Sequence, residues 1–141
     1  FDQGEAVLKA EFQAILADFF PRYVRIITRE QYRDDILEVR IEGHTSSAWF
    51  GAASEDDAYI RNMNLSQQRT RSTLAYVLGL EPVQADKQWL KSHLTANGLS
   101  SAKVVRNELG QENADRSRRV EFRVRTDAES RIATILDQVI Q

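Results

Sequence analysis

A helical repeat of apolar residues begins the chain. Leucine, isoleucine and phenylalanine recur at intervals of three and four residues from Leu8 to Phe19, which predicts an amphipathic helix. Proline removes a backbone donor and clashes with the preceding helical turn, so Pro21 should kink or stop this helix. The apolar spacing around Ile26 indicates that the helix resumes before the polar segment that starts at Arg29.

The pattern then changes from helical to alternating. Apolar and charged residues alternate from Leu37 onward, which predicts a half-buried strand that ends at Gly43. A second alternating segment runs from Arg119 to Arg125, with valine and phenylalanine on one side and arginine and glutamate on the other. If these strands are neighbours, their charged sides can form cross-strand ion pairs. The arginines that start at Arg116 would then belong to a solvated sheet face rather than to a nucleic-acid surface.

Residues 45–62 read as a long connection between the first strand and the second helix. It contains small residues, two aromatic residues and the acidic cluster Glu55, Asp56 and Asp57. Loops of this length inside a compact domain are usually functional or mobile. The helical spacing of apolar residues that begins at Leu65 predicts the second helix.

Three further elements are expected in the second half of the chain. A third helix should occupy residues 85–97 and stop at the Asn-Gly pair that ends with Gly98. Residues 102–109 should form a strand. Thr126 and Glu129 make a capping box, which predicts the start of a C-terminal helix. Its apolar stripe is too regular to be left in water and consists of Ile132, Ile135, Leu136 and Val139.

These elements predict one α+β domain over residues 1–141, a small mixed sheet with helices packed on one face, plus the C-terminal helix. With 42% hydrophobic and 28% charged residues, the chain has the composition of an ordinary soluble domain. The net charge of −2 disfavours a dedicated nucleic-acid binder, and no apolar run approaches the roughly 20 residues of a membrane-spanning helix. Because the chain starts at Phe1 without a methionine, we interpret it as a fragment of a longer membrane-associated protein.

The sequence contains none of the common catalytic motifs. No phosphate-binding loop, zinc-binding histidine pair or nucleophile elbow follows a predicted strand. The absence of cysteine excludes a thiolate metal site and a cysteine nucleophile. His44 and His93 are far apart, and a single histidine after a strand is more often a hydrogen-bonded turn residue than a base. The acidic cluster lacks the spacing of a calcium loop. We therefore expect no enzyme, no cofactor and no metal.

One polar pattern favours a binding site. Ser66 is a good N-cap residue, because its hydroxyl can accept from the open amides of a first helical turn. Arg69 would follow in that turn, on the side of Leu65. Free amides, the positive end of the helix dipole and a guanidinium would then meet, which suits a carboxylate ligand. From the spacing alone, a surface ion pair of Arg69 explains the pattern equally well.

Three motifs in this order resemble the OmpA C-terminal-like family, which includes the stator domain of MotB. They are a strand that ends in Gly-His-Thr at residues 43–45, the pattern N-x-x-L-S-x-x-R from Asn62 to Arg69, and a late strand with R-R-V-E from Arg118. The resemblance covers nearly the whole chain. It implies a βαβαβ-type sandwich, whose first strand would lie just before or at Phe1, and binding of peptidoglycan stem peptides through diaminopimelate.

The resemblance also implies the residues of the ligand site. Arg69 corresponds to the arginine that takes the ligand carboxylate, and Asn62 to the asparagine of the motif. Leu65 would shape the pocket, with the hydroxyl and backbone amide of Thr45 beside it. The family has an acidic residue, which meets the ammonium group of the ligand, at the position of Ser46.

A serine cannot neutralise an ammonium group, so this departure leaves three alternatives. The affinity is lower, or a carboxylate of the loop, Asp56 or Asp57, takes the place of the missing acid at Ser46. In the third alternative, the chain has lost tight binding and kept the fold as an oligomerisation module.

The leading interpretation is a non-catalytic periplasmic domain that binds peptidoglycan and anchors a membrane complex to the cell wall. The motifs are most similar to the MotB-like branch of the family, whose members partner a MotA-type channel and include a subunit of Zorya anti-phage defence. This branch implies an inner-membrane anchor, a homodimer and a MotA-like partner. A protein-interaction or dimerisation domain without a wall ligand is the alternative. Nucleic-acid binding through the arginine strand is the third hypothesis.

Overall fold

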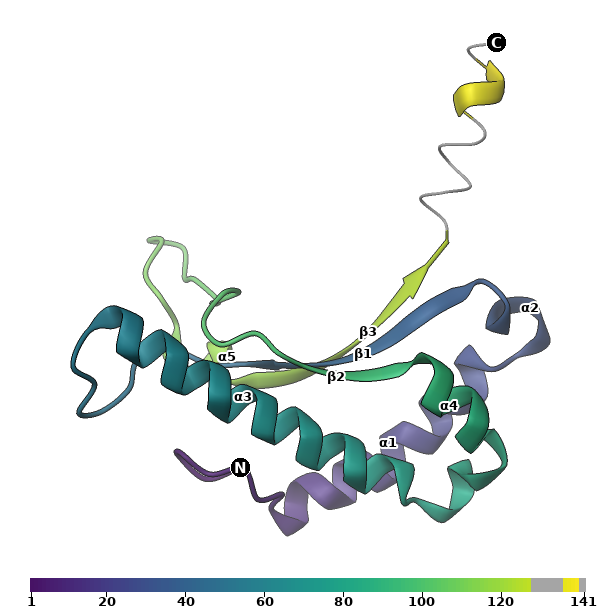
Figure 1. The fold of residues 1–141 in the computed structure, drawn as a ribbon, viewed down its shortest axis with the longest axis horizontal. Coiled ribbons are helices and arrows are strands. Elements are labelled where there is room, and N and C mark those ends of the chain that lie inside the picture. Colours follow the sequence, from purple (N-terminus) through teal and green to yellow (C-terminus); the bar gives the residue numbers. More distant parts are fainter. Residues whose placement is uncertain (128–135, 140–141) are drawn as a thin grey trace.

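A three-stranded mixed sheet runs through the molecule, with the strand order β2-β1-β3 (Figure 1). The computed structural model describes residues 1–127 and 136–139. The central strand β1 (Ile36–His44) pairs in parallel with β2 (Leu94–Gly98) and antiparallel with β3 (Arg119–Thr126). The long helices lie together on one side of the sheet (Figure 1), so the predicted α+β arrangement is confirmed.

The first helix, α1 (Ala10–Ile27), is uninterrupted, although Pro21 lies inside it. The expected stop at this proline is therefore wrong. A proline in a helix interior costs about 3 kcal/mol. Each fully buried apolar side chain contributes about 1.5–3 kcal/mol, and Leu16, Phe20 and Val24 are all buried on the core side of α1. The helix continues because this packing, on both sides of the proline, outweighs the loss.

The central strand differs in detail from its prediction. Val39 and Ile41 are completely buried, as the alternation predicts. Leu37 was expected on the same buried side but is 50% exposed, because the pairing with β3 has a register irregularity at this point. The strand also continues through Gly43 to His44 instead of ending at the glycine.

The helix that follows, α3 (Glu55–Leu78), begins well before the predicted second helix. The hydroxyl of Ser54 caps it by accepting from the backbone N–H of Asp57 at 3.0 Å. The acidic cluster is therefore the first helical turn, where carboxylates interact favourably with the helix dipole, and not part of a loop. The connection after β1 shortens to residues 45–54.

Two more predictions need correction in the second half of the chain. The predicted third helix is present as the short α4 (Lys87–His93), which follows a 3-10 helix, η1 (Glu81–Asp86). It ends at His93, and the Asn-Gly pair ends β2 rather than a helix. Residues 102–109 form turns and coil with one isolated bridge residue, so the predicted strand is wrong.

The ends of the chain bear on two other expectations. Residues 1–9 contain a turn and no strand, so the first strand implied by the resemblance is not among the described residues. Thr126, the expected helix cap, is the last residue of β3. Glu129, Ile132 and Ile135 of the predicted C-terminal helix lie outside the described residues. Residues 136–139 are helical, but Leu136 and Val139 are exposed there, so these two residues of the apolar stripe are not buried as expected. Two further short helices are α2 (Glu30–Arg33) and α5 (Ala114–Ser117).

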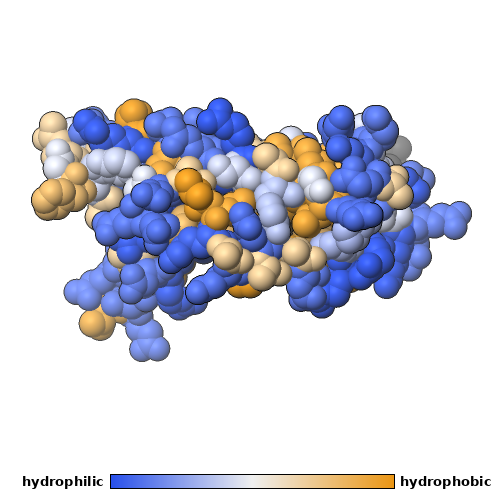
Figure 2. Space-filling view, turned by 90° about the horizontal axis from the view of Figure 1, so that it is seen from below, coloured by the Kyte–Doolittle hydropathy of each residue, from blue (hydrophilic) through white to orange (hydrophobic). Residues whose placement is uncertain are grey.

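The core lies between the sheet and the helices. Its buried side chains come from α1, β1, α3, η1, α4 and β2. On the face opposite to the sheet, apolar residues lie in separate patches among hydrophilic ones (Figure 2), as on an ordinary protein surface. Within the described part of the chain, no helix has the length and apolar character needed to span a bilayer. The buried residues of this core cluster are Leu16, Phe20, Val24, Ile27, Ile36, Val39, Ile41, Val77, Val83, Leu90 and Leu94.

Two glycines set how closely α3 approaches the sheet. A Cβ atom on Gly43 would lie 2.9 Å from the carbonyl oxygen of Ser66, and a Cβ on Gly98 would lie 2.7 Å from its hydroxyl oxygen. The latter would also collide with the backbone nitrogen of Gln67. Real Cβ atoms do not approach other atoms so closely, so both strands need glycine where α3 crosses them.

We expect Gly98→Ala to lower the free energy of unfolding by about 1–3 kcal/mol, because the added methyl group overpacks the contact with α3. Gly79→Ala is the matched control, since its added Cβ would have no neighbour closer than 3.5 Å. The control should stay within about 0.5 kcal/mol of the parent. Urea denaturation measures both. Equal stability of the two variants would contradict the described contact.

Candidate ligand-binding site

A cleft of about 940 Å³ lies beside the end of β1, between α3, the N-terminal segment and the start of β3. Its volume is at the upper end of the range of small-ligand sites, about 300–1,000 Å³. Residues that sequence reasoning missed also line it, among them Phe1 and Arg118, together with the loop aromatics Trp49 and Phe50. The structure brings to this cleft five of the expected site residues, namely Thr45, Ser46, Asn62, Leu65 and Arg69.

Arg69 extends from α3 into the cleft and holds the N-terminal segment of its own chain. Its Nε donates to the carbonyl oxygen of Glu5 at 2.8 Å, and its Nη2 donates to that of Asp2 at 3.0 Å. The ring of Phe1 covers the guanidinium, with 5.1 Å from Cζ to the ring centroid. The carboxylate of Asp2 is paired with Lys9 at 3.1 Å, so only main-chain oxygens reach the arginine from these residues.

These two carbonyl oxygens accept from neighbouring N–H groups on one edge of the guanidinium. A carboxylate binds arginine most strongly when it accepts from two N–H groups on one edge of the guanidinium. The Nε and Nη2 groups of Arg69 form such an edge, and both donate to main-chain oxygens of the N-terminal segment. Burial lowers the pKa of Arg69, and the nearby charge of Arg118 lowers it further. A partly desolvated cation of this kind favours an anionic partner.

Asn62 shapes the cleft by fixing the loop that follows β1. Its Nδ2 donates to the carbonyl oxygens of Ser46 and Ala48, each at 3.2 Å. Both Asn62 and Ser46 are buried. The backbone N–H of Thr45 donates to the carbonyl of Ser100 at 2.9 Å, while its hydroxyl is buried without a partner. The loop is therefore held by backbone and amide contacts, which leaves polar side-chain atoms for a ligand.

Ser66 is not the N-cap that the sequence suggests. It lies inside α3, where its hydroxyl donates to the carbonyl of Met63 at 2.9 Å and accepts from the backbone N–H of Ser100 at 3.1 Å. The open amides of this helix lie instead at its start, after Ser54. The hypothesis that a helix N-terminus reinforces Arg69 is therefore wrong, and the guanidinium acts without it.

The two loop acids do not reach the cleft. Asp56 and Asp57 lie in the first turn of α3, and neither lines the site. The carboxylate of Asp57 accepts from the backbone of Ala53 at 3.0 Å and from Nε of Arg61 at 2.9 Å. The backbone hydrogen bond, and then Arg61, lower the pKa of Asp57. This carboxylate is committed to capping and pairing at the helix start.

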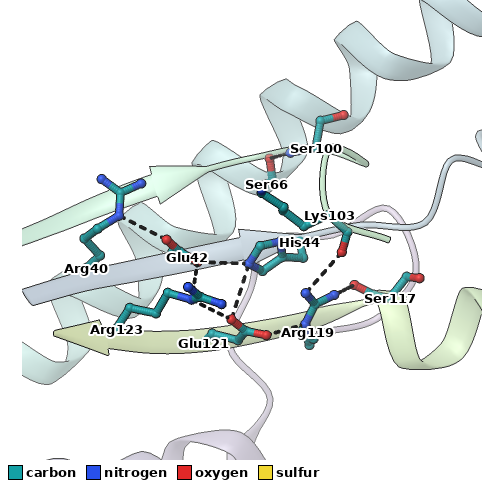
Figure 3. A network of polar contacts seen from close by, with 10 residues as sticks. All are labelled: Arg40, Glu42, His44, Ser66, Ser100, Lys103, Ser117, Arg119, Glu121 and Arg123. Atoms are coloured by element: carbon teal, nitrogen blue, oxygen red, sulfur yellow. Dashed lines mark hydrogen bonds and ion pairs between the residues drawn. The ribbon is translucent and has the colours of Figure 1, made fainter. Parts of the chain in front are cut away.

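At the wall of the cleft, the buried His44 contacts a network of acids and arginines, of which Glu42 is also buried (Figure 3). Its Nε2 is 3.3 Å from a carboxylate oxygen of Glu42 and 3.8 Å from one of Glu121. Arg123 lies 3.2 Å from both carboxylates, and Arg119 is 2.6 Å from Glu121. The sequence signal for this network was the spacing of two residues from Glu42 to His44, which places both on one face of β1.

Three acid and imidazole groups of this network approach each other as metal ligands do. Ligand atoms of Glu42, His44 and Glu121 lie within 4.8 Å of one another. However, the guanidinium groups of Arg119 and Arg123, with a further arginine on β1, already neutralise the two carboxylates. A divalent cation would have to displace these arginines, so the cluster is better explained as an ion-pair network.

The arginine strand does not form a basic surface. Residues of β3 lie opposite residues of β1 in register, with Arg125 beside Glu38 and Arg123 beside Arg40. Arg125 pairs across the strands with Glu38 at 3.8 Å, and Arg123 pairs with Glu42. The predicted cross-strand ion pairs are confirmed, and they account for these arginines without nucleic acid.

Comparisons with known proteins agree with this fold. No family model matches the chain. The Zorya protein ZorB of Escherichia coli is 46% identical over 138 residues, which are 98% of this chain but only 58% of that protein. A MotB-like protein from Desulfovibrio vulgaris is 26% identical, with a TM-score of 0.57 over 89% of this chain and 67% of that one. The C-terminal domain of Helicobacter pylori MotB also has a TM-score of 0.57, at 16% identity, with 100% and 95% covered.

The buried histidine makes stability depend on pH. Burial, and then the charge of Arg119, lower the pKa of His44 below its ordinary value of 6.5, against the hydrogen bond to Glu42. The unfolded chain therefore takes up this proton at higher pH than the folded protein. The stability from neutral His44 is complete above about pH 6.5 and is lost as the pH falls towards the lower folded pKa.

We expect His44→Gln to flatten the fall in the free energy of unfolding between about pH 7 and pH 5. Glutamine is neutral throughout this range and can still donate to Glu42. Urea denaturation of parent and variant at several pH values measures the two slopes. A variant that keeps the full slope of the parent would assign this pH dependence to other groups.

Proposed function

Because the chain belongs to the OmpA/MotB-like family, on the branch of the Zorya protein ZorB, we propose that it binds peptidoglycan without catalysis and anchors a membrane protein complex to the cell wall. The observation that carries this proposal is the geometry of Arg69. Two N–H groups on one edge of its guanidinium donate to main-chain oxygens of the N-terminal segment and to no charged group there.

The ligand group proposed for this edge is a carboxylate of diaminopimelate in a peptidoglycan stem peptide. It replaces the carbonyl oxygens of Asp2 and Glu5. A carboxylate adds the attraction of opposite charges to two parallel hydrogen bonds, which neutral main-chain carbonyls cannot supply. A ligand carboxylate therefore competes with the N-terminal segment for Arg69. The two hydrogen bonds that it forms replace two hydrogen bonds that Arg69 already makes in the free protein.

The other proposed site residues act around this contact. Asn62 positions the loop whose residues Thr45 and Ser46 face the ligand, and Leu65 supplies the apolar wall. We assign no direct ligand contact to the two loop acids, because they lie outside the cleft. Their negative charges can influence a ligand only from a distance, and salt in the solution screens this influence.

The role of the whole protein follows from the family. The domain would be the periplasmic part of a longer protein that is anchored in the inner membrane, dimerises and partners a MotA-like channel. A Zorya-type anti-phage motor is the proposed complex, since the matched relative is a Zorya protein. The chain spans 58% of that relative, so the membrane anchor and the channel contact would belong to the remaining part.

One observation favours the alternative of an interaction or dimerisation domain without a wall ligand. Arg69 already has partners in its own chain, and these alone could explain why an arginine stands at this position. In that alternative, Arg69 has a structural role, and its removal changes stability but no binding. The two functions are therefore distinguished by a binding measurement on a folded variant.

We expect Arg69→Ala to weaken co-sedimentation with diaminopimelate-type sacculi by about ten- to a hundredfold, because a charge-assisted two-point contact is lost. Arg71→Ala is the matched control: this arginine is exposed on the same helix and does not line the cleft. It should sediment like the parent. Circular dichroism and thermal melts confirm that both variants are folded. A folded Arg69→Ala variant that sediments as well as the control would contradict the proposed site.

A further inference from the structure

The charges that line the cleft are all of one sign. Three arginines contribute to its wall, namely Arg69, Arg118 and Arg119. Among the residues that the structure describes, no aspartate or glutamate lines it. A cleft with this charge concentrates anions and repels cations, and its partly apolar walls strengthen the field inside.

The three arginines differ in how far their charge is already used. Arg119 donates to Glu121 at 2.6 Å and to the carbonyls of Ser117 and Lys103, so each nitrogen of its guanidinium already has an acceptor. Arg118 makes one pair at 3.2 Å with Asp115, whose side chain is 97% exposed. Such a surface pair contributes little to stability. Arg118 is therefore free to exchange its partner for a ligand.

Arg118 also lies close enough to Arg69 for the two charges to interact. Its charge is one of the causes that lower the pKa of Arg69. Two guanidinium groups that repel each other in a partly desolvated cleft are stabilised together by an anion that contacts both. This coupling favours a ligand with more than one negative group.

The acidic residues nearest to the cleft are held by other partners. Glu42 and Glu121 are bound in the arginine network behind it. Glu112 accepts from the backbone N–H of Ser47 at 2.9 Å and from its hydroxyl at 2.7 Å. Arginines neutralise Glu42 and Glu121, while both carboxylate oxygens of Glu112 are held by Ser47, and none of the three acids lines the cleft.

Neutral acceptors are available instead. The Nδ1 atom of His44 and the hydroxyl of Thr45 are buried without a hydrogen-bond partner, and both residues line the cleft. Each can accept from an N–H group, whether that group is an amine or an amide. A neutral acceptor gives a weaker bond to an ammonium than a carboxylate does, so it distinguishes less strongly between charged and uncharged nitrogen.

We propose that the cleft is a dicarboxylate site, in which Arg69 binds one carboxylate, Arg118 binds a second, and no acid selects for the amino groups. This inference rests on the proposed function and specifies which groups of the wall peptide are recognised. Peptidoglycan stem peptides carry several free carboxylates, so two can be presented together. The amino groups of diaminopimelate meet only neutral acceptors in the cleft.

Three small competitors of sacculus sedimentation test the proposal on the parent protein. Diaminopimelate has two carboxylates and two amino groups, pimelate keeps only the carboxylates, and lysine keeps both amino groups with one carboxylate. Pimelate should displace the protein at concentrations within about threefold of those needed for diaminopimelate. Lysine should need at least about tenfold more, since it lacks the second charge-assisted contact. Competition by lysine that equals or exceeds that by pimelate would overturn the proposal.

Variants of the protein test whether Arg118 binds the second carboxylate of the ligand. Arg118→Gln should weaken competition by pimelate about tenfold and leave that by lysine nearly unchanged. Arg116→Gln is the control, because this neighbouring arginine does not line the cleft. Ser46→Asp adds an acid to the cleft wall and should shift preference from pimelate to diaminopimelate. If Ser46→Asp does not fold, the competitors on the parent protein still decide.

The outcomes separate this inference from the proposed function. If the parent protein does not sediment with sacculi at all, peptidoglycan binding itself fails. If it sediments and Arg69→Ala abolishes this, but only compounds with amino groups compete, the function stands and the dicarboxylate site is wrong. Equal effects of Arg118→Gln and Arg116→Gln would likewise remove Arg118 from the site.

Discussion

The close approach of α3 to the sheet is the constraint on which the rest of the structure depends. Ser66 of α3 lies against both Gly43 of β1 and Gly98 of β2, where no side chain fits between helix and strands. The hydroxyl of Ser66 also accepts from the backbone N–H of Ser100, which ties the helix to the chain after β2. These contacts fix the distance between α3 and the sheet. Arg69, about one helical turn after Ser66, therefore lies beside the end of β1.

The distribution of charge explains why a cleft at this place can bind. On the outer face of the sheet, acids and arginines alternate within and between β1 and β3, and each acid has a guanidinium beside it. Around the cleft this compensation stops. Arg69 has only main-chain oxygens and an aromatic ring as its partners among the described residues, and Arg118 has one exposed acid. The uncompensated positive charge is thus concentrated where the loop and the N-terminal segment enclose a ligand-sized space.

Local patterns in the sequence predicted those elements in which one face is buried and the other is exposed. The alternation in β1 and β3 identified both strands and their ion pairs, because a half-buried strand requires a period of two. The family motifs identified five residues that the structure places in one cleft. The short β2 was missed, because its Asn-Gly end resembles a helix stop and most of its length is only partly buried.

Contacts between distant segments left no local pattern and could not be predicted. Ser66 has the residue type of a helix cap, but only the packing against Ser100 shows that it lies inside a helix. The start of α3 was overlooked although Ser54 and Asp57 fit a cap and its helical partner. Likewise, nothing in the sequence indicates that the carbonyls of residues 2 and 5 would hold Arg69, since hydrogen bonds to the main chain do not depend on residue type.

The central claim is that the guanidinium edge of Arg69 binds the ligand carboxylate in place of those main-chain carbonyls. The most direct test follows the side-chain Nε–H resonance of Arg69 by NMR while a soluble stem-peptide fragment of peptidoglycan is added. The account predicts a large shift of this resonance that saturates with the ligand, while the corresponding signal of Arg71 stays unchanged. Saturable shifts elsewhere in the domain with an unchanged Arg69 signal would contradict it.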